Sequence, residues 1–306
     1  MQRYSRLQSW ITVASLAAGL GKPLALHAQG VIDRLPDEDG FARASGKNIQ
    51  PFFEGWQQLA DGRIAMWFGY LNRNYEEQPD IPVGADNKFD LREDMGQPTH
   101  FYPRRHLFVF KVDLPKDWDK EKRLIWTLTC NGRTSTANGW LQPEWEVDDG
   151  VIQMNIGPGG APPVDPPNTA PLITGSGDQT IDLGKSAKLA VSATDDGIPK
   201  PRTRSTQSAN NPARMPLPAG AAPAPRAQLG LRIRWMLYRA PAEGGEVTFE
   251  PDATHPVIGG QTADLATEAT FSAPGIYWLR AIASDGLLET PYDVKVTVRR
   301  PGSASR

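Results

Sequence analysis

The chain has 306 residues, of which 33 are Lys or Arg and 35 are Asp or Glu, so its formal net charge is −2. A charge this close to zero excludes binding to nucleic acid or to an anionic membrane surface that is driven by net charge alone. Cys130 is the single cysteine, so the chain cannot form an intramolecular disulfide. The length exceeds what one small domain normally uses, and two domains are therefore expected.

Residues 1–29 have the three parts of a secretory signal peptide. Arg3 and Arg6 provide a basic start, an apolar stretch covers Trp10–Leu20, and small residues precede a cleavage site near Ala28. A membrane anchor would need roughly 18 uninterrupted apolar residues, and Gly and Lys interrupt this stretch. No other part of the chain could span a bilayer. Cleavage would leave 30 basic against 35 acidic residues, and we expect an exported protein, periplasmic or extracellular.

Residues 30–156 are expected to form an N-terminal β-sandwich domain. Four segments have the apolar pattern of strands: Arg63–Leu71, Leu107–Leu114, Leu124–Cys130 and Val151–Ile156. Alternation in the second segment places four residues toward the core, namely Phe108, Phe110, Val112 and Leu114. The third segment leads into Asn131-Gly132, a strong signal for a two-residue hairpin turn, and it places Cys130 on a buried face.

A run rich in Pro and Gly at residues 157–167 separates this domain from the rest of the chain. Proline cannot donate to a β-ladder and glycine loses much entropy on ordering, so the run is expected to be an extended linker. Beyond it, residues 168–300 contain further strand patterns, which lie at 168–172, 184–197, 231–238, 276–283 and 292–298.

The last two of these strands are joined by the turn Ser284-Asp285-Gly286. The residues expected on their buried faces are Ile276, Trp278, Ala281 and Ala283 in the first strand and Val294, Val296 and Val298 in the second. Together with the blocks at 168–172 and 184–197, these strands resemble those of an immunoglobulin-like sandwich of the PKD or cadherin-like kind. The resemblance covers about residues 168–299. It implies that Trp235 is buried between the sheets and that the domain is a spacer or binding scaffold rather than a catalyst. Since no segment of ten or more residues shows a helical apolar period, the expected fold class is all-β, with two β-sandwich domains joined by the Pro/Gly-rich linker.

One segment of the second domain has no strand pattern. Residues 197–228 contain seven prolines and five basic residues but no aromatic and no acidic residue. Such a composition cannot bury enough apolar surface to order itself, so we expect a disordered insertion. It is either a basic arm for an acidic surface or a neutral insertion, which a loop tolerates at little entropic cost.

The densest set of polar residues lies in the long loop at 72–106, in a domain that resembles uncharacterised exported bacterial proteins. The loop also holds four aromatic residues, so it is expected to pack on the sandwich and to be the best candidate for a binding site. The candidate binding residues are Asn72, Arg73, Asn74, Glu76, Glu77, Asp86, Asn87, His100, Arg104 and Arg105.

Four roles remain open for this loop. Its oxygen donors at Glu76, Glu77, Asp80, Asp86, Asn87 and Asp90 could bind Ca²⁺, although their spacing matches no helical calcium loop. A transition metal would need His100 and His106 with a carboxylate. A glycosidase would need a carboxylate pair from Glu76, Glu77 and Asp94. The remaining interpretation is that Asn72, Arg73, Asn74 and Glu76 satisfy the backbone of the loop itself and that Arg104 or Arg105 pairs with its acids.

No recognisable catalytic motif supports an enzyme, since the chain has neither a Gly-x-Ser-x-Gly elbow nor a His-Glu-x-x-His helix. The expected function is a non-enzymatic binding or structural module of the cell envelope that requires no cofactor, and Ca²⁺ is the ion that its oxygen donors would favour. Its partner would be an envelope protein or a polysaccharide, and not nucleic acid. The alternative is a carbohydrate-active protein that uses the 72–106 loop and stacks sugars on exposed Trp residues, of which Trp118, Trp140 and Trp145 are the candidates.

Overall fold

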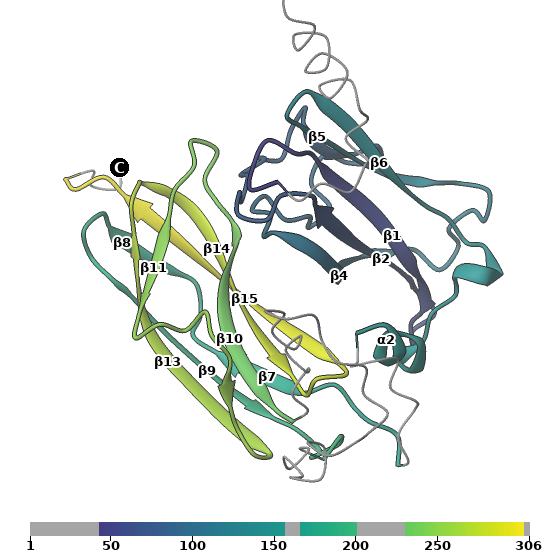
Figure 1. Cartoon of the computed structure of the whole chain (residues 1–306). Coiled ribbons are helices and arrows are strands. Elements are labelled where there is room, and N and C mark those ends of the chain that lie inside the picture. The colour runs from purple at the N-terminus through teal and green to yellow at the C-terminus, as the bar shows by residue number, and fades with distance from the viewer. Residues whose placement is uncertain (1–42, 157–165, 201–229, 303–306) are drawn as a thin grey trace, which may run out of the picture. The chain divides into compact units, whose positions relative to one another are not determined.

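The structure is a computed structural model that describes residues 43–156, 166–200 and 230–302 (Figure 1). The predicted signal peptide at residues 1–29 lies outside the described residues, as do most of the predicted linker at 157–167 and most of the predicted insertion at 197–228. Nearly all regular structure is β-strand, which confirms the all-β class. Within the described ranges, no helix is long and apolar enough to cross a bilayer.

Six strands in the N-terminal part form two antiparallel three-stranded sheets, with the orders β1-β2-β4 and β3-β5-β6. The strands are β1 (Ile49–Gln58), β2 (Ile64–Asn72), β3 (Asn87–Phe89), β4 (Arg104–Leu114), β5 (Leu124–Cys130) and β6 (Arg133–Gly139). A 3₁₀ helix, η1 (Pro143–Trp145), and an α-helix, α2 (Asp149–Ile156), follow.

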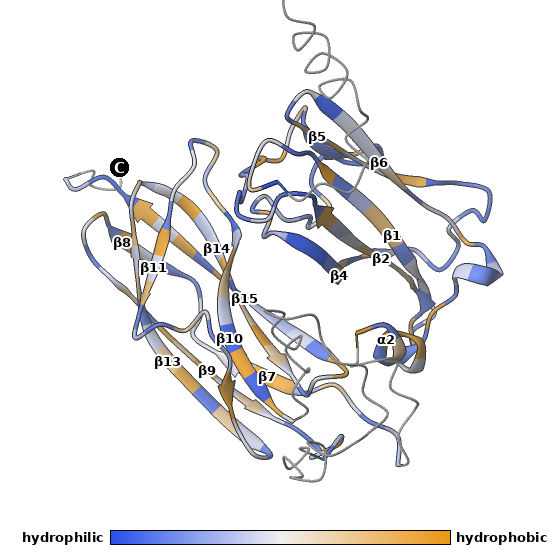
Figure 2. Cartoon of the chain, in the orientation of Figure 1, coloured by the Kyte–Doolittle hydropathy of each residue, from blue (hydrophilic) through white to orange (hydrophobic). Residues whose placement is uncertain are grey.

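An aromatic core fills the space between these two sheets. Phe68 of β2 stacks on Phe110 of β4 with ring centroids 5.6 Å apart, and Phe89 of β3 stacks on Trp126 of β5 at 6.0 Å. Phe68 and Trp126 then meet edge to face at 6.1 Å and join the sheets. Large aromatic side chains contribute most of the apolar area that such a core removes from water. The strands in Figure 2 accordingly alternate between apolar and polar colours.

The C-terminal part is a second sandwich of nine strands. These are β7 (Leu172–Gly175), β8 (Gln179–Asp182), β9 (Ala187–Thr194), β10 (Arg232–Arg239), β11 (Val247–Glu250), β12 (Val257–Ile258), β13 (Thr262–Phe271), β14 (Gly275–Ser284) and β15 (Glu289–Arg299). One sheet has the order β11-β13-β9-β7, and the other has the order β12-β10-β14-β15-β8.

This strand order is that of an immunoglobulin-like sandwich. In sequence order, β9 and β13 pair in one sheet while β10, β14 and β15 pair in the other, which is the arrangement of strands B and E against strands C, F and G. The opening segment is divided, because β7 pairs with β9 whereas β8 pairs in parallel with β15. The immunoglobulin-like prediction for residues 168–299 is confirmed.

The core of the second sandwich lies between its two sheets. Trp235 of β10 is fully buried there, as predicted, in the strand where immunoglobulin-like domains bury a Trp. Val294, Val296 and Val298 of β15 also belong to this core, so the predicted face of the last strand is confirmed.

The predicted face of β14 was wrong in its first half. Tyr277 and Leu279 are fully buried with Ala281 and Ala283, whereas Ile276 is 52% exposed and Trp278 lies on the outer face. The run Ile276–Leu279 is apolar at every position, so alternation within it cannot show which side chains face the core. Ala281 and Ala283 lie an even number of residues from Tyr277 and Leu279, so all four side chains point to the same, buried face.

The segment Val151–Ile156 is a helix and not the predicted closing strand. Asp148 provides the reason, since its carboxylate accepts a hydrogen bond from the Val151 backbone N–H at 2.8 Å and its carbonyl accepts one from Ile152. This is the contact of a helix N-cap, and Asp149 adds a favourable negative charge in the first turn.

Two further features of the N-terminal sandwich differ from prediction. Phe108 is half-buried rather than on the core side, because its backbone has φ +48° and lies in a bulge where β4 shifts register against β2. The 72–106 loop is less irregular than expected, since it contains β3 and since β4 already begins at Arg104.

Several hydrogen bonds join residues 94–109 of the first sandwich to the second. The Arg239 guanidinium forms two bonds to the Asp94 carboxylate, at 2.7 and 2.9 Å, and donates a third to the Gln97 carbonyl. The Tyr238 hydroxyl donates to the Gly96 carbonyl at 2.6 Å. The described residues belong to one compact unit, and the division into separately folding domains at 157–167 stays a prediction.

Candidate functional site

Two asparagines of the predicted site are buried and bonded to each other. The Asn72 amide donates to the carbonyls of Glu77 and Phe101, and its oxygen accepts from the backbone and side-chain nitrogens of Asn74 at 3.0 Å each. Asn74 in turn bonds both backbone groups of Lys47. These contacts attach the loop to the chain ahead of β1, so the two side chains have a structural role.

Asn87 also serves the loop from inside. It is fully buried, donates to the carbonyls of Ile81 and Pro98, and accepts a hydrogen bond from the Trp126 indole at 2.9 Å. These bonds are all to protein groups, and both amide hydrogens are used, so the side chain holds the loop in place.

The predicted charged residues do not converge on one point. Glu77 accepts a bond from the Gly46 backbone at 2.6 Å, while Glu76 is exposed. Arg104 lies over the ring of Tyr75 at 4.1 Å. The Nε atom of Arg73 is buried without a hydrogen-bond partner among the described residues.

Arg105 forms an ion pair, but with an acid outside the 72–106 loop. Its guanidinium contacts the Glu54 carboxylate of β1 at 2.7 Å. Burial raises the pKa of Glu54, and the charge and hydrogen bonds of Arg105 oppose that rise. The pair joins β1 to β4 across the intervening β2 and therefore braces this sheet.

The two histidines have separate partners. His100 is placed between Asp80, at 2.7 Å, and Gln78, at 3.0 Å. His106 stacks on Tyr70 and bonds the Pro103 carbonyl at 3.1 Å, and burial lowers its pKa. In the parts of the chain that the structure describes, no three His, Cys, Asp or Glu side chains are placed to hold a metal ion.

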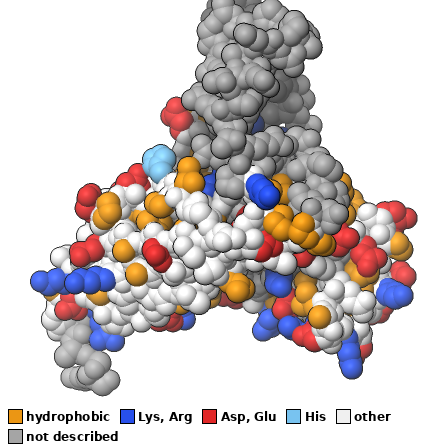
Figure 3. Space-filling model, turned by 90° about the horizontal axis from the view of Figure 1, so that it is seen from below, with side chains coloured by type: hydrophobic (Ala, Val, Ile, Leu, Met, Phe, Trp, Pro, Cys, Tyr) orange, Lys and Arg blue, Asp and Glu red, His pale blue; other side chains and the backbone are white. Residues whose placement is uncertain are grey.

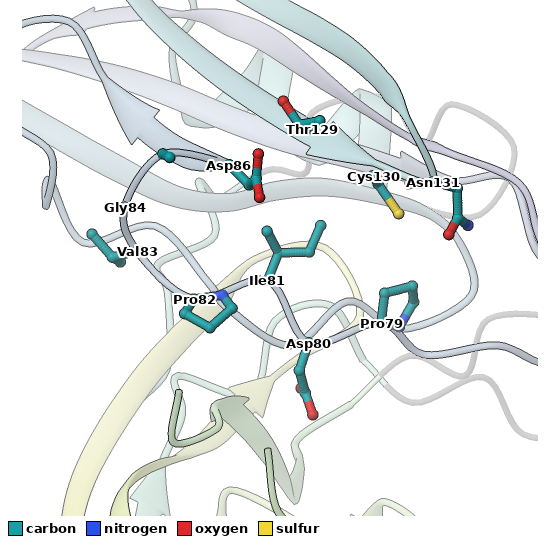
Figure 4. A pocket seen from close by; sticks show the side chains of 11 residues that line it. Pro79, Asp80, Ile81, Pro82, Val83, Gly84, Asp86, Thr129, Cys130 and Asn131 are labelled. Carbon is teal, nitrogen blue, oxygen red and sulfur yellow. The ribbon is translucent and has the colours of Figure 1, made fainter. Parts of the chain in front are cut away.

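A cavity of about 430 Å³ nevertheless opens beside the loop (Figure 4). Residues 79–86 form one wall and residues 129–131 form the other. Figure 4 shows the Asp86 carboxylate and the Cys130 thiol on opposite walls, both in the upper part of the view, and Asp80 directed away from them. Cys130 is buried, as predicted, and burial followed by the charge of Glu77 raises its pKa, so the thiol is not activated as a nucleophile.

The Trp residues proposed for sugar stacking are only partly available. Trp118 is half-buried, packs against the core of the first sandwich, and has Lys122 over its ring at 4.4 Å. Arg123 covers Trp140 at 3.9 Å. Trp145 is 44% exposed and packs beside Phe53.

A second group of polar residues lies in the immunoglobulin-like sandwich. Asp285 is fully buried, and its carboxylate accepts bonds from the backbones of Leu287 and Leu288 and from the Asn168 amide at 2.8 Å. We call Asn168, Asp195, Asp196 and Asp285 the acidic cluster. The Asp196 carboxylate accepts two bonds from Thr169, and that of Asp195 accepts one from Gly197.

Two oxygens of the acidic cluster lack partners. The side-chain Oδ1 atoms of Asn168 and Asp195 are buried and accept no hydrogen bond from any described residue. Burial raises the pKa of Asp195 to about 6, and the negative charges of Asp285 and Asp196 add to the rise. Burial also raises the pKa of Asp285. An unsatisfied buried oxygen costs free energy, so this cluster could gain from a proton or a cation.

The sequence predicted a turn at Ser284-Asp285-Gly286, but it did not indicate that Asp285 belongs to a cluster. Asp195-Asp196-Gly197 and Ser284-Asp285-Gly286 do form turns, and what was missed is that the fold places both beside Asn168. An Asn at the start of such a sandwich, combined with two Asp-Gly turns at strand ends, is the sequence signal that could have found it.

No protein-family model matches this chain, and no curated protein sequence matches it. Solved structures do show likeness: the PKD domain of human KIAA0319 has 16% identity and a TM-score of 0.24, covering 48% of this chain and 98% of that chain. The fibronectin(III)-like modules of Clostridium thermocellum CbhA have 8% identity and a TM-score of 0.24, covering 88% and 96%. Domains 4 and 5 of the S-layer protein SbsC have 10% identity and a TM-score of 0.24, covering 58% and 65%.

Proposed function

We propose that this chain is an exported, non-enzymatic binding or structural module of the cell envelope. The proposal rests on the hydrogen-bond partners of the polar side chains in the 72–106 loop. Asn72, Asn74 and Asn87 all bond protein groups, and the charged residues of the loop point to separate partners. A loop built this way serves as a rigid surface and does not supply a set of converging reactive groups.

The cavity beside the loop supports binding better than cleavage. A glycosidase needs two carboxylates on opposite sides of the scissile bond. Of the two carboxylates in the cavity wall, Asp80 already bonds His100, which leaves Asp86 alone.

Assays on soluble neutral and acidic polysaccharides test this function. We expect no increase in reducing ends over a control without protein, for the mature chain and for the Asp86→Asn variant alike. Turnover by the mature chain that disappears in D86N would overturn the non-enzymatic assignment. Export is tested by fractionating cells that produce the full chain, in which the protein should leave the cytoplasm with residues 1–29 removed.

We further propose that the acidic cluster binds Ca²⁺ when this ion is abundant outside the cell. Calcium prefers oxygen ligands in flexible numbers, and the cluster offers the unpartnered Oδ1 atoms of Asn168 and Asp195 beside the Asp285 carboxylate. Backbone carbonyls and water would complete the coordination, since no three charged ligands converge in the described residues. The ion would offset the repulsion between the carboxylates and stiffen this part of the sandwich.

Thermal unfolding with Ca²⁺, with Mg²⁺ at equal ionic strength and with a chelator tests the site. Binding to the folded state alone raises the melting temperature in proportion to the logarithm of ligand concentration. We expect Ca²⁺ to raise it for the mature chain and for the control Asp264→Asn, whose exposed carboxylate lies on β13. The rise should vanish in Asp195→Asn. An equal rise in D195N would show that calcium acts elsewhere.

A further inference from the structure

A smaller cavity of about 170 Å³ lies on the five-stranded sheet of the immunoglobulin-like sandwich. Its wall includes Arg232, Arg234, Pro256, Ile282, Ser284 and Glu289. Binding pockets for drug-sized ligands are about 300–1,000 Å³. This cavity therefore has room for one functional group of a larger ligand, with two arginines beside it.

The strand register places both arginines on the outer face of the sheet. Arg232 is directly opposite Ser284, and Arg234 is directly opposite Ile282 on β14. Side chains two positions apart on a strand share a face, and the intervening Ile233 points into the core. The two guanidinium groups consequently project into the same cavity, over a floor that is partly apolar.

These two charges are poorly compensated. Among the described residues, neither arginine has a carboxylate within salt-bridge distance, and the contact of Arg234 is to the Met236 sulfur at 3.6 Å. Burial lowers the pKa of Arg232, although the charges of Glu289 and Asp285 oppose this. In the view of Figure 3, acidic and basic side chains are interspersed over the surface. The cavity wall itself contains two arginines and one acid, Glu289, which is a local excess of positive charge.

An oxyanion fits this excess. Arginine presents a planar set of donors that matches a carboxylate, and such charge-assisted bonds are the stronger kind. The predicted insertion at 197–228 contains no Asp or Glu, so it cannot supply the carboxylate. A carboxylate that binds the two arginines would therefore come from another part of the chain or from another molecule.

The neighbouring edge of the sheet indicates the kind of molecule. β12 is the outermost strand beside β10, and its residues Val257 and Ile258 are 39% and 63% exposed. An edge strand offers unpaired backbone groups to an extended peptide, which presents alternate side chains to one face. A sugar ring would instead gain from an aromatic platform, and no aromatic side chain belongs to the wall of this cavity.

We propose that the Arg232–Arg234 cavity and the edge strand β12 together bind an extended acidic segment of a partner protein, with one carboxylate between the two guanidiniums. This deepens the proposed binding role. It uses different residues from the acidic cluster, so the calcium experiment can fail without affecting it.

The test measures binding of the mature chain to a short synthetic peptide in which valine and glutamate alternate. A peptide in which valine and lysine alternate is the charge-reversed control. Arg232→Gln and Arg234→Gln should each weaken binding by about tenfold, which corresponds to about 1.4 kcal/mol. Glu289→Gln should strengthen it, because it removes the acid that competes for Arg232. Arg299→Gln, at the end of β15, is the matched control and should change nothing.

Polygalacturonate and inorganic sulfate are the competing probes. Support requires that the glutamate peptide binds, that added salt weakens it, and that R232Q and R234Q reduce it while R299Q does not. Binding of polygalacturonate but not of the peptide, with the same dependence on both arginines, would overturn the assignment to a protein partner. Binding of sulfate alone, or equal binding of both peptides, would overturn the proposal as a whole.

Discussion

Trp235 shows at the scale of one residue how strongly the second sandwich depends on packing. Its side chain is fully buried among both sheets, and it stands opposite Ala281 on β14. Large-to-small truncation of such a residue loses the transfer free energy and leaves a cavity. We expect Trp235→Ala to lower the free energy of unfolding by about 3–5 kcal/mol, measured by urea denaturation of the full chain.

The companion variant Trp235→Phe separates packing from polarity. The indole Nε1 of Trp235 is buried and has no hydrogen-bond partner among the described residues, so phenylalanine removes an unsatisfied donor while it keeps most of the volume. We expect a loss of about 1 kcal/mol or less. A loss as large as that of W235A would contradict the packing explanation.

Asp195 gives the acidic cluster a dependence on pH. The folded-state pKa is raised to about 6, above the unfolded value of about 3.9, so the folded state binds the proton more tightly. Its contribution to stability is therefore greatest at low pH and falls as the pH rises from about 4 to about 6. Without added cation, Asp195→Asn should remove this fall in stability. Above pH 6 the variant should be more stable than the parent by a few tenths to about 1 kcal/mol, and the difference is small because solvent screens the partly exposed carboxyl.

Chemical denaturation of both proteins between about pH 4 and pH 8 checks this. The difference between parent and D195N isolates Asp195 from the other acids, including Asp285, whose raised pKa acts in the same direction. A difference that does not change with pH would show that Asp195 titrates near its ordinary value.

The sequence located the polar loop of the first sandwich, but it did not predict the hydrogen-bond partners of the side chains in that loop. Asn72 meets Phe101 across 29 positions and Arg105 meets Glu54 across 51. Such partners are chosen by the three-dimensional path of the chain, and no local pattern records that path. For the same reason the acidic cluster, whose Asn168 and Asp285 are 117 positions apart, was missed.

Strands were predicted correctly where apolar and polar residues alternate clearly along the sequence, and they were missed where that alternation is weak. β15 was correct because Val294, Val296 and Val298 alternate with polar residues. β13 alternates just as regularly in burial, but its buried residues include two alanines and Thr267, whose apolar signal is small. The helix α2 was mistaken for a strand because eight residues are too few for a helical period to stand out.

The hairpin turn between β5 and β6 is an element whose conformation the sequence did specify. Asn131 has φ +51° and Gly132 has φ +73°, as a two-residue turn with two left-handed positions requires. Gly132→Ala places a Cβ in this region, and we expect a loss of about 1 kcal/mol in the free energy of unfolding. Gly177→Ala is the control, since an added Cβ there meets nothing within 4 Å. An equal effect of both variants would contradict the assigned turn.

For the whole molecule, the question is whether the two sandwiches support each other. Each has its own hydrophobic core, which is what separately folding domains need. Hydrogen bonds between the two sandwiches instead favour mutual stabilisation, since residues 94–109 of the first bond Tyr238, Arg239 and Arg280 of the second. Arg239 and Arg280 are each only 7% exposed, and a buried guanidinium that loses its partners is strongly destabilising.

A double-mutant cycle between Asp94 and Arg239 measures this mutual support. The side chain of Arg239 is 9% exposed, so its two bonds to Asp94 should give a coupling energy of about 1 kcal/mol or more. The exposed pair Asp61 and Arg63, which lies within the first sandwich, is the matched control and should give about 0.5 kcal/mol or less. The hydrogen bond from Arg239 lowers the pKa of Asp94, so the coupling is present above the unfolded pKa and should be lost as the pH falls through the lowered folded-state pKa. If the coupling is no greater than that of the control pair, the sandwiches act as independent units, and cutting at residues 157–167 should then release two folded fragments.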